Sequence, residues 1–409
     1  MFGQLFLKEC RETARSLIYW ILVGIMLFFF ATQLGETEIA REPEKGQESY
    51  GMHQSEDPDV IMRNTLGTLA DEYYRESYTT YPIGFAKTVK PDKKEQKRIG
   101  EILEEATGLD QGEIKKTMEE YYGSVTGLVA EMPMEPVDGL TYKRFKELMK
   151  EVDELLGGGS HYGEQYLAAN GIEPMTYEDA IKEYHLLVEK DGLSGGYARL
   201  FSDYMVIILG ILPVFLATTR EMRDRRAKMQ ELIYTRRAKS GTIVVSRYLS
   251  MIVMTLLPLF LLSFLPLAEC IKVAASDGIR IDHLAYAKYI LGWLLPTVMI
   301  VTAVGMFLTD LTDTAAAVLV QGVWWFVSVF TGVQGIDGGA YGWNLIPRHN
   351  TELNYKGFHD GFVQLVSNRV LYVSFAIIIV ALTVGIYSQK RRGRLNVRGK
   401  ILADRKSKS

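Results

Sequence analysis

The sequence predicts a membrane all-α protein with six transmembrane helices, an N-terminal interfacial helix and a mainly helical extracellular domain. Two observations indicate this fold class. The 409 residues separate into long apolar runs and one highly charged block. Six of the apolar runs, each of about 18 to 23 residues, are long enough to cross ~30 Å of hydrocarbon as a helix.

The six expected spans divide into one isolated span and a group of five. The first follows the N-terminal segment and the others form a transmembrane domain over residues 201–388. The expected boundaries are 17–34, 201–219, 248–268, 286–308, 314–333 and 369–388.

Basic residues beside the spans predict the orientation, since Lys and Arg near span ends stay in the cytoplasm. Three of them precede the first span, and nine lie between residues 220 and 247. Nine more occupy a tail over residues 389–409, which we expect near anionic lipid headgroups. Both termini are therefore expected in the cytoplasm of a multi-pass protein of the cell membrane, with a bacterial cytoplasmic membrane as the expected location.

The charged block predicts an extracellular domain over residues 35–200. Between residues 35 and 202 there are 34 acidic and 19 basic side chains, and acidic residues hardly influence orientation. Apolar residues at helical spacing predict five helices, near 59–76, 92–106, 111–122, 141–156 and 176–190. The only cysteines, Cys10 and Cys270, lie outside this block, so no disulfide within it is expected.

The N-terminal segment, residues 1–16, carries an apolar stripe that includes Phe2, Leu5 and Phe6. This pattern predicts a helix in the membrane interface, although a basic, orienting N-terminus would look similar. The first apolar run lacks a small-x-small cleavage pattern, so we interpret it as an uncleaved anchor.

The cytoplasmic stretch between the second and third spans combines many charges with apolar residues at helical spacing. It predicts a short amphipathic helix near 222–237, which suits docking of a protein partner. A basic loop lying on lipid is the alternative. The docking candidates are Met229, Glu231, Leu232, Ile233, Tyr234, Arg236 and Arg237.

The segment of residues 334–368, before the last span, is rich in Gly and aromatic residues. It is too polar to span, so it predicts either a partly re-entrant or interfacial hairpin at the outer face or an ordinary outside loop. The gate candidates in it are Trp343, Asn344, Pro347 and Arg348.

Motifs for chemistry are not found in the sequence. The stretch from Gly393 to Lys400 has the wrong spacing for a phosphate-binding loop and lacks its hydroxyl residue, and no His-Glu-x-x-His pair occurs. We therefore expect no catalytic residue, no metal site and no nucleic-acid partner. Asp203, Asp310 and the other charges near the spans fall at predicted span edges, which disfavours an ion-coupled carrier.

The chain resembles the permeases of type-2, or G-type, ATP-binding cassette (ABC) exporters. The resemblance covers nearly the whole length, and its most specific pieces are residues 229–237 and Ser246-Arg247-Tyr248-Leu249, which look like a coupling helix and the entry to the third span. Many members have a proline after the coupling helix, where this chain has Ala238-Lys239-Ser240.

The resemblance implies a permease subunit without enzymatic activity, which pairs with a second permease chain, alike or different, and with cytoplasmic ABC ATPase subunits. ATP and Mg would be bound by the partner, and this chain would hold no cofactor. The exported cargo, whether drug, peptide, lipid or ion, is not specified. Two alternatives stay open: a mechanotransmitting ABC membrane protein with four spans, and a membrane-anchored extracellular receptor or peptidase.

Overall fold

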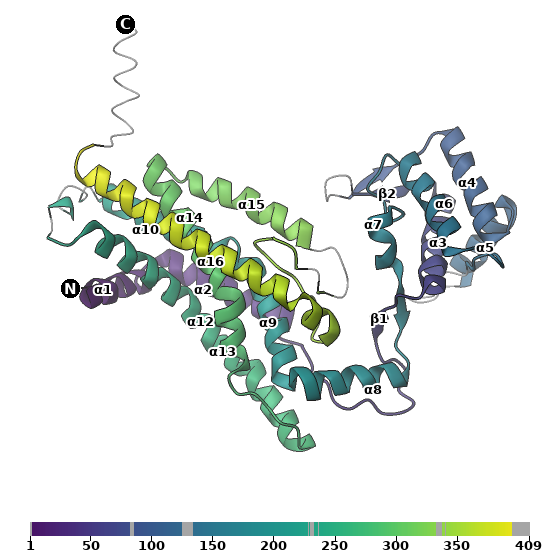
Figure 1. The fold of residues 1–409 in the computed structure, drawn as a ribbon, viewed down its shortest axis with the longest axis horizontal. Coiled ribbons are helices and arrows are strands. Elements are labelled where there is room, and N and C mark those ends of the chain that lie inside the picture. Colours follow the sequence, from purple (N-terminus) through teal and green to yellow (C-terminus); the bar gives the residue numbers. More distant parts are fainter. Residues whose placement is uncertain are drawn as a thin grey trace, which may run out of the picture. The chain divides into compact units, whose positions relative to one another are not determined.

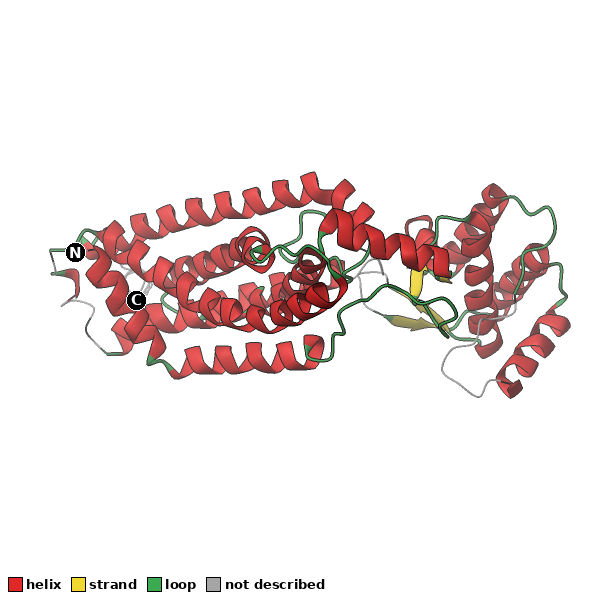
Figure 2. Ribbon diagram, turned by 90° about the horizontal axis from the view of Figure 1, so that it is seen from below, coloured by secondary structure: helices red, strands yellow, loops and turns green. Residues whose placement is uncertain are grey.

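The computed structural model describes residues 2–81, 86–124, 134–227, 229, 233–235, 237–332, 338–339 and 341–394. The described chain is mostly helical with a few short strands (Figure 2). It forms two compact units. The helical unit runs to Glu42 and resumes at Ile181, and the second unit comprises Pro43–Ala180.

The helical unit is built from long apolar helices, whose arrangement is seen in Figure 1. Two of them, α14 and α16, pack along each other, and α1 packs against α12. The elements are α1 (Phe2–Ala14), α2 (Leu17–Leu34), η2 (Leu186–Asp191), α9 (Leu193–Leu209), α10 (Leu212–Arg226), α12 (Ser240–Asp277), α13 (Ala285–Tyr289), η3 (Ile290–Leu294), α14 (Leu295–Thr312), α15 (Ala316–Gly332) and α16 (Tyr355–Arg391).

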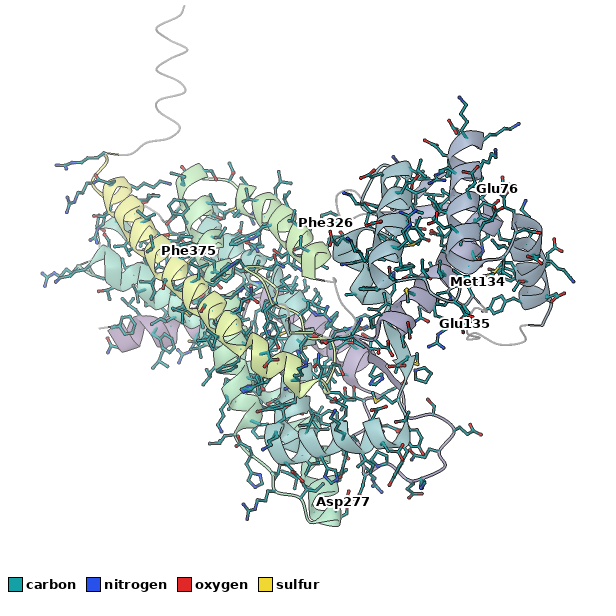
Figure 3. All side chains as sticks on the ribbon, turned by 45° about the vertical axis from the view of Figure 1, so that its right-hand side comes forward. Glu76, Met134, Glu135, Asp277, Phe326 and Phe375 are labelled. Carbon is teal, nitrogen blue, oxygen red and sulfur yellow. The ribbon has the colours of Figure 1, made fainter. Side chains whose placement is uncertain are left out.

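Within the described residues, four helices are long and apolar enough to cross a membrane, and the count rises to five if the bent pair α9 and α10 is one span. The four are α2, α12, the continuous stretch Ala285–Thr312 and α16. These helices identify a membrane protein with a helical membrane region. The outer surfaces of its helices carry exposed apolar side chains such as Phe326 on α15 and Phe375 on α16 (Figure 3).

Several predicted boundaries need correction. The first predicted span coincides with α2, but the helices α12 and α16 have 38 and 37 residues and extend well beyond the predicted runs. Hydropathy cannot detect these extensions because charged ends of a helix resemble loops in composition. The predicted hairpin over 334–368 is accordingly wrong in its second half, since α16 begins at Tyr355.

The second predicted span is broken. The axes of α9 and α10 meet at 43°, and Pro213 follows the break, where its ring prevents a regular helix from continuing. The side chain of Gln321 donates to the Gly210 carbonyl (2.6 Å), and Trp325 Nε1 donates to the Ile207 carbonyl (2.7 Å). Helix α15 thus satisfies carbonyls that the break would leave unpaired inside the unit.

The Pro43–Ala180 unit is a small helical domain with its own core. Apolar side chains of α3, α4, α5 and α6 form this core, with two antiparallel strand pairs, β1–β4 and β2–β3, beside it. The helix predictions for this region are confirmed to within about two residues, except that the last one continues as η2. The elements are β1 (Met52–Gln54), α3 (Pro58–Arg75), β2 (Tyr78–Thr80), β3 (Lys87–Val89), α4 (Lys93–Thr107), α5 (Gln111–Ser124), α6 (Tyr142–Leu155), α7 (Glu164–Leu167), η1 (Ala168–Asn170) and β4 (Ile172–Pro174). Helix α8 (Tyr177–His185) begins in this unit and ends in the helical unit.

One carboxylate lies inside this core. Glu72, on α3, is 8% exposed and accepts hydrogen bonds from the Tyr162 hydroxyl (2.5 Å) and the Thr79 amide (2.8 Å). Burial nevertheless raises the pKa of Glu72 above its ordinary value, and the two hydrogen bonds oppose that shift only in part.

Candidate functional site

The helical unit has two polar regions that its sequence pattern singles out. One surrounds the ends of α1, α10, α12 and α16, and we call it the basic end. The other surrounds the segment of residues 341–354, which we call the hairpin. Both hold charged side chains inside an otherwise apolar helix bundle, so both are candidates for function.

Part of the predicted amphipathic helix over 222–237 lies outside the described residues, and within it Ile233 and Tyr234 are helical. The first residues of this range belong to α10, which continues from the broken span as far as Arg226 and ends in a turn at Ala227. Of the seven docking candidates, Met229 and Arg237 are exposed and Ile233 and Tyr234 are half-buried. Glu231, Leu232 and Arg236 lie outside the described residues.

Five buried or nearly buried charges connect three helices at the basic end, and we call them the basic-end cluster. They are Glu9 on α1, Arg220, Glu221 and Asp224 on α10, and Arg247 on α12. Arg220 forms a bidentate pair with Glu9, with N···O distances of 2.6 and 2.8 Å. Arg247 pairs with Glu221 at 3.2 Å and with Asp224, and it also lies 3.8 Å from Glu9.

This cluster makes α1 part of the bundle. Glu9 is 6% exposed, and at the rim Arg223 donates to Glu12 and lowers the pKa of that carboxyl. Buried ion pairs tolerate little change, because removing one partner leaves a charge without compensation. Movement of α10 would therefore carry α1 and α12 with it.

Helix α16 reaches the same end and holds the segment between α10 and α12. Arg391 donates from Nε to the Tyr234 carbonyl (2.8 Å) and from Nη1 to the Ala238 carbonyl (2.5 Å). The ring of Tyr234 packs edge-on against Tyr387. Lys390 pairs with Asp313, in the turn between α14 and α15. The candidate docking segment is consequently attached to α16 by its backbone.

At the other polar region, the four gate candidates belong to one folded segment. Trp343 is 59% exposed, whereas its carbonyl accepts from the Tyr372 hydroxyl (2.9 Å). The Asn344 carbonyl accepts from Asn368 (2.9 Å). Pro347 is buried, and Arg348 pairs with Asp203. The structure thus packs this segment against the helices through its backbone and leaves the Trp343 ring exposed.

Asp203 is the main anchor for the hairpin from α9. It is fully buried, and it accepts from Arg348 Nε (3.1 and 3.0 Å) and from the backbone amides of His349 and Asn350. Asp203 lies inside α9, which begins eight residues before the predicted span, and it is six residues from the end of this helix. A carboxylate that accepts four hydrogen bonds is well compensated despite burial.

A second α9 side chain, Arg199, holds the end of the hairpin. Its guanidinium is fully buried, pairs with Asp191, and donates to the Glu352 carbonyl (2.6 Å). Nearby, His349 bonds to the Tyr341 hydroxyl (2.9 Å) and the Leu353 carbonyl (3.0 Å). Burial lowers the pKa of His349 to about 3, so this imidazole is neutral at physiological pH.

Arg369 of α16 is the third anchor and was not recognised in the sequence. It is 5% exposed and donates to Thr297 Oγ1 (2.8 Å), to the Trp293 carbonyl (3.1 Å) and to the Asn368 side chain. Longer contacts of 3.4 Å reach the carbonyls of Asn344 and Leu345. All of these acceptors are neutral, and Arg369 forms no ion pair with the described residues.

In the described part of the chain, no group of three or more His, Cys, Asp and Glu side chains is placed to hold a metal ion. His349 is enclosed by the hairpin, and His359 is exposed on α16.

Comparison with known proteins identifies no protein that is similar to this chain. No protein-family model, no curated protein and no solved structure matches this chain.

Proposed function

We propose that this chain is the permease subunit of an ABC exporter, driven by ATP hydrolysis in a separate ATPase subunit. The observation that carries the proposal is the attachment of the segment between α10 and α12. Arg391 ties this segment to α16, and the basic-end cluster ties its flanking helices to α1. A force applied to the segment would therefore reach four helices at once.

In this proposal the membrane region has six spans, with both termini in the cytoplasm and the Pro43–Ala180 unit outside. The bent pair α9–α10 forms the second span and α15 the fifth. The 17 residues of α15 extend ~26 Å at 1.5 Å per residue, slightly less than the ~30 Å thickness of the hydrocarbon core. Two such chains, each bound by one ATPase subunit, would enclose the export path.

A direct test purifies the tagged chain from its native membranes in mild detergent and assays the sample for vanadate-sensitive ATP hydrolysis. The proposal predicts a stoichiometric partner that hydrolyses ATP, since the sequence of this chain has no phosphate-binding loop. A pure, active, partner-free receptor or peptidase would contradict the proposal.

A mechanotransmitting ABC protein with four spans is the second candidate, favoured by the four unbroken helices of sufficient length. Single cysteines near residues 275 and 350, in a chain without Cys10 and Cys270, distinguish the two. If both sites react with an impermeant maleimide added from outside, six spans are supported. Labelling of only one of them would support a different topology.

A further inference from the structure

A long apolar groove runs along the outer surface of the helical unit, near the hairpin. It has a volume of about 600 Å³ and lies between the stretch Lys288–Pro296 and the stretch Phe358–Ser374 of α16. The second stretch extends ~24 Å along its helix. Ligand pockets usually have volumes of this order.

The α16 wall of the groove extends beyond the expected hydrocarbon region. The uncharged run of α16 begins at Val370, and the helix before it carries Lys356, His359, Asp360 and Arg369. Only the last five residues of the groove's α16 wall, from Val370 to Ser374, belong to the uncharged run. The facing stretch Lys288–Pro296, by contrast, lies within the expected span 286–308. The groove would thus run from the outer part of the hydrocarbon region to the membrane interface.

The opposite wall of the groove is locally irregular. It includes η3, a π-helical turn, and such turns occur often at functional sites. Within η3, Gly292 faces open space, because a Cβ atom built there meets nothing within 4 Å. The absence of a side chain at Gly292 widens the groove at its middle.

Two polar features lie beside this apolar surface. Trp293 lines the groove and is 2% exposed, and its indole Nε1 has no hydrogen-bond partner among the described residues. Arg369 also lines the groove, and its positive charge is balanced by neutral acceptors alone. An unused donor and a cation without a counter-ion among the described residues favour a ligand with an anionic group.

We propose that this groove binds the acyl chain of a single-chain anionic amphiphile, with the anionic group beside Trp293 and Arg369. The inference rests on the proposed export function and adds the chemical class of cargo. An apolar groove that reaches from the hydrocarbon region to the membrane interface would shelter an acyl chain from water while the molecule leaves the bilayer.

Photolabelling of the full chain in detergent tests the site without an ATPase or nucleotide. The probe is palmitic acid that carries a diazirine on its chain, and labelled peptides are mapped by mass spectrometry. Labelling should concentrate on the two groove walls, and Gly292→Leu should weaken it at least tenfold by filling the open space. If α2 and α15 were labelled as strongly as the groove walls, or if Gly292→Leu were labelled as strongly as the wild type, the proposal would be overturned.

Matched variants separate occlusion from misfolding. Gly24 on α2 also faces open space, so Gly24→Leu should label like the wild type. Ser374 lines the groove and Ser367 does not, although each donates its hydroxyl to the carbonyl four residues earlier. Ser374→Trp should reduce labelling and Ser367→Trp should not. If Ser367→Trp reduced labelling as much as Ser374→Trp does, the assigned site would be contradicted.

The head group is tested by competition with two unlabelled molecules of equal chain length. Palmitate should compete at least tenfold better than hexadecanol if an anion is recognised, and equal competition would refute that part of the proposal. Specific labelling without any ATPase partner would uphold the groove and contradict the exporter. An ATPase-coupled chain that palmitate does not label would uphold the exporter and contradict the groove.

Discussion

Replacing Arg247 should destabilise the helical unit more than its single charge suggests. Arg247 is 4% exposed and contacts three carboxylates. Without it, Glu9 keeps its bidentate pair with Arg220, and Asp224 keeps a contact with Arg220 at 3.4 Å. Glu221 loses the only ion pair that it makes with described residues. A buried carboxylate would then remain unpaired.

The expected cost follows from that one unpaired carboxylate. Removing one member of a buried ion pair typically costs ~3–5 kcal/mol, so Arg247→Met should lower the free energy of unfolding by this amount. The double variant Arg247→Met/Glu221→Leu removes both charges, and its stability should return to within ~1 kcal/mol of the wild type. The coupling between the two changes should therefore be large and favourable.

Equilibrium unfolding in mixed detergent micelles, followed by circular dichroism, measures these differences. Arg223→Gln is the matched control, because Arg223 is half exposed and pairs with Glu12 at the rim. This control should cost ~1 kcal/mol or less. If Arg247→Met cost as little as the control, or if the double variant were less stable than the single one, the assignment of a buried, interdependent cluster would be refuted.

Three further predictions concern other parts of the chain. Asp203→Asn should speed amide exchange at residues 348–350 at least tenfold, equivalent to ~1.4 kcal/mol, and unchanged exchange would show that Asp203 does not hold the hairpin. Gln321→Leu should cost ~1–3 kcal/mol in the same unfolding assay, because the Gly210 carbonyl loses its partner; a neutral effect would contradict this role of α15. Burial raises the pKa of Glu72, so the folded state holds this proton more tightly than the unfolded state. Amide protection in α3, corrected for intrinsic rates, should accordingly fall as pH rises from 4.5 towards 7, and Glu72→Gln should remove that dependence.

The sequence predicts the helical fold class and most helices well, and the reason is physical. Hydrocarbon demands long uncharged runs, and runs of this kind locate α2, α12, α14 and α16. The break between α9 and α10 is harder to predict, since its stability depends on side chains of α15 more than 100 residues later.

The candidate site was predicted in part. The sequence pattern singled out the segment around Tyr234 and the hairpin around Arg348, and both lie in polar regions of the structure. The role of Arg369 was not predicted, because a cation at the edge of an apolar run is normally interpreted as one that sets the orientation of the span in the membrane. Its acceptors lie on residues 293, 297, 344, 345 and 368, and spacing along one chain does not reveal that they meet.

In the proposed transmission route, the docking segment is held by contacts with α16. The segment is short, and its backbone carbonyls at Tyr234 and Ala238 are used by Arg391. A segment attached in this way depends little on its own helical stability, because tertiary contacts hold it in place.

The most direct test of the central claim is the rate of ATP hydrolysis by the ATPase that co-purifies with the chain, measured in reconstituted vesicles. The account predicts that the triple variant Leu232→Asp/Arg236→Glu/Arg237→Glu abolishes both association and stimulated hydrolysis. The control variant Arg280→Glu, an exposed charge reversal in the loop after α12, should behave like the wild type. Association and stimulated hydrolysis that both survive in the triple variant would contradict the account.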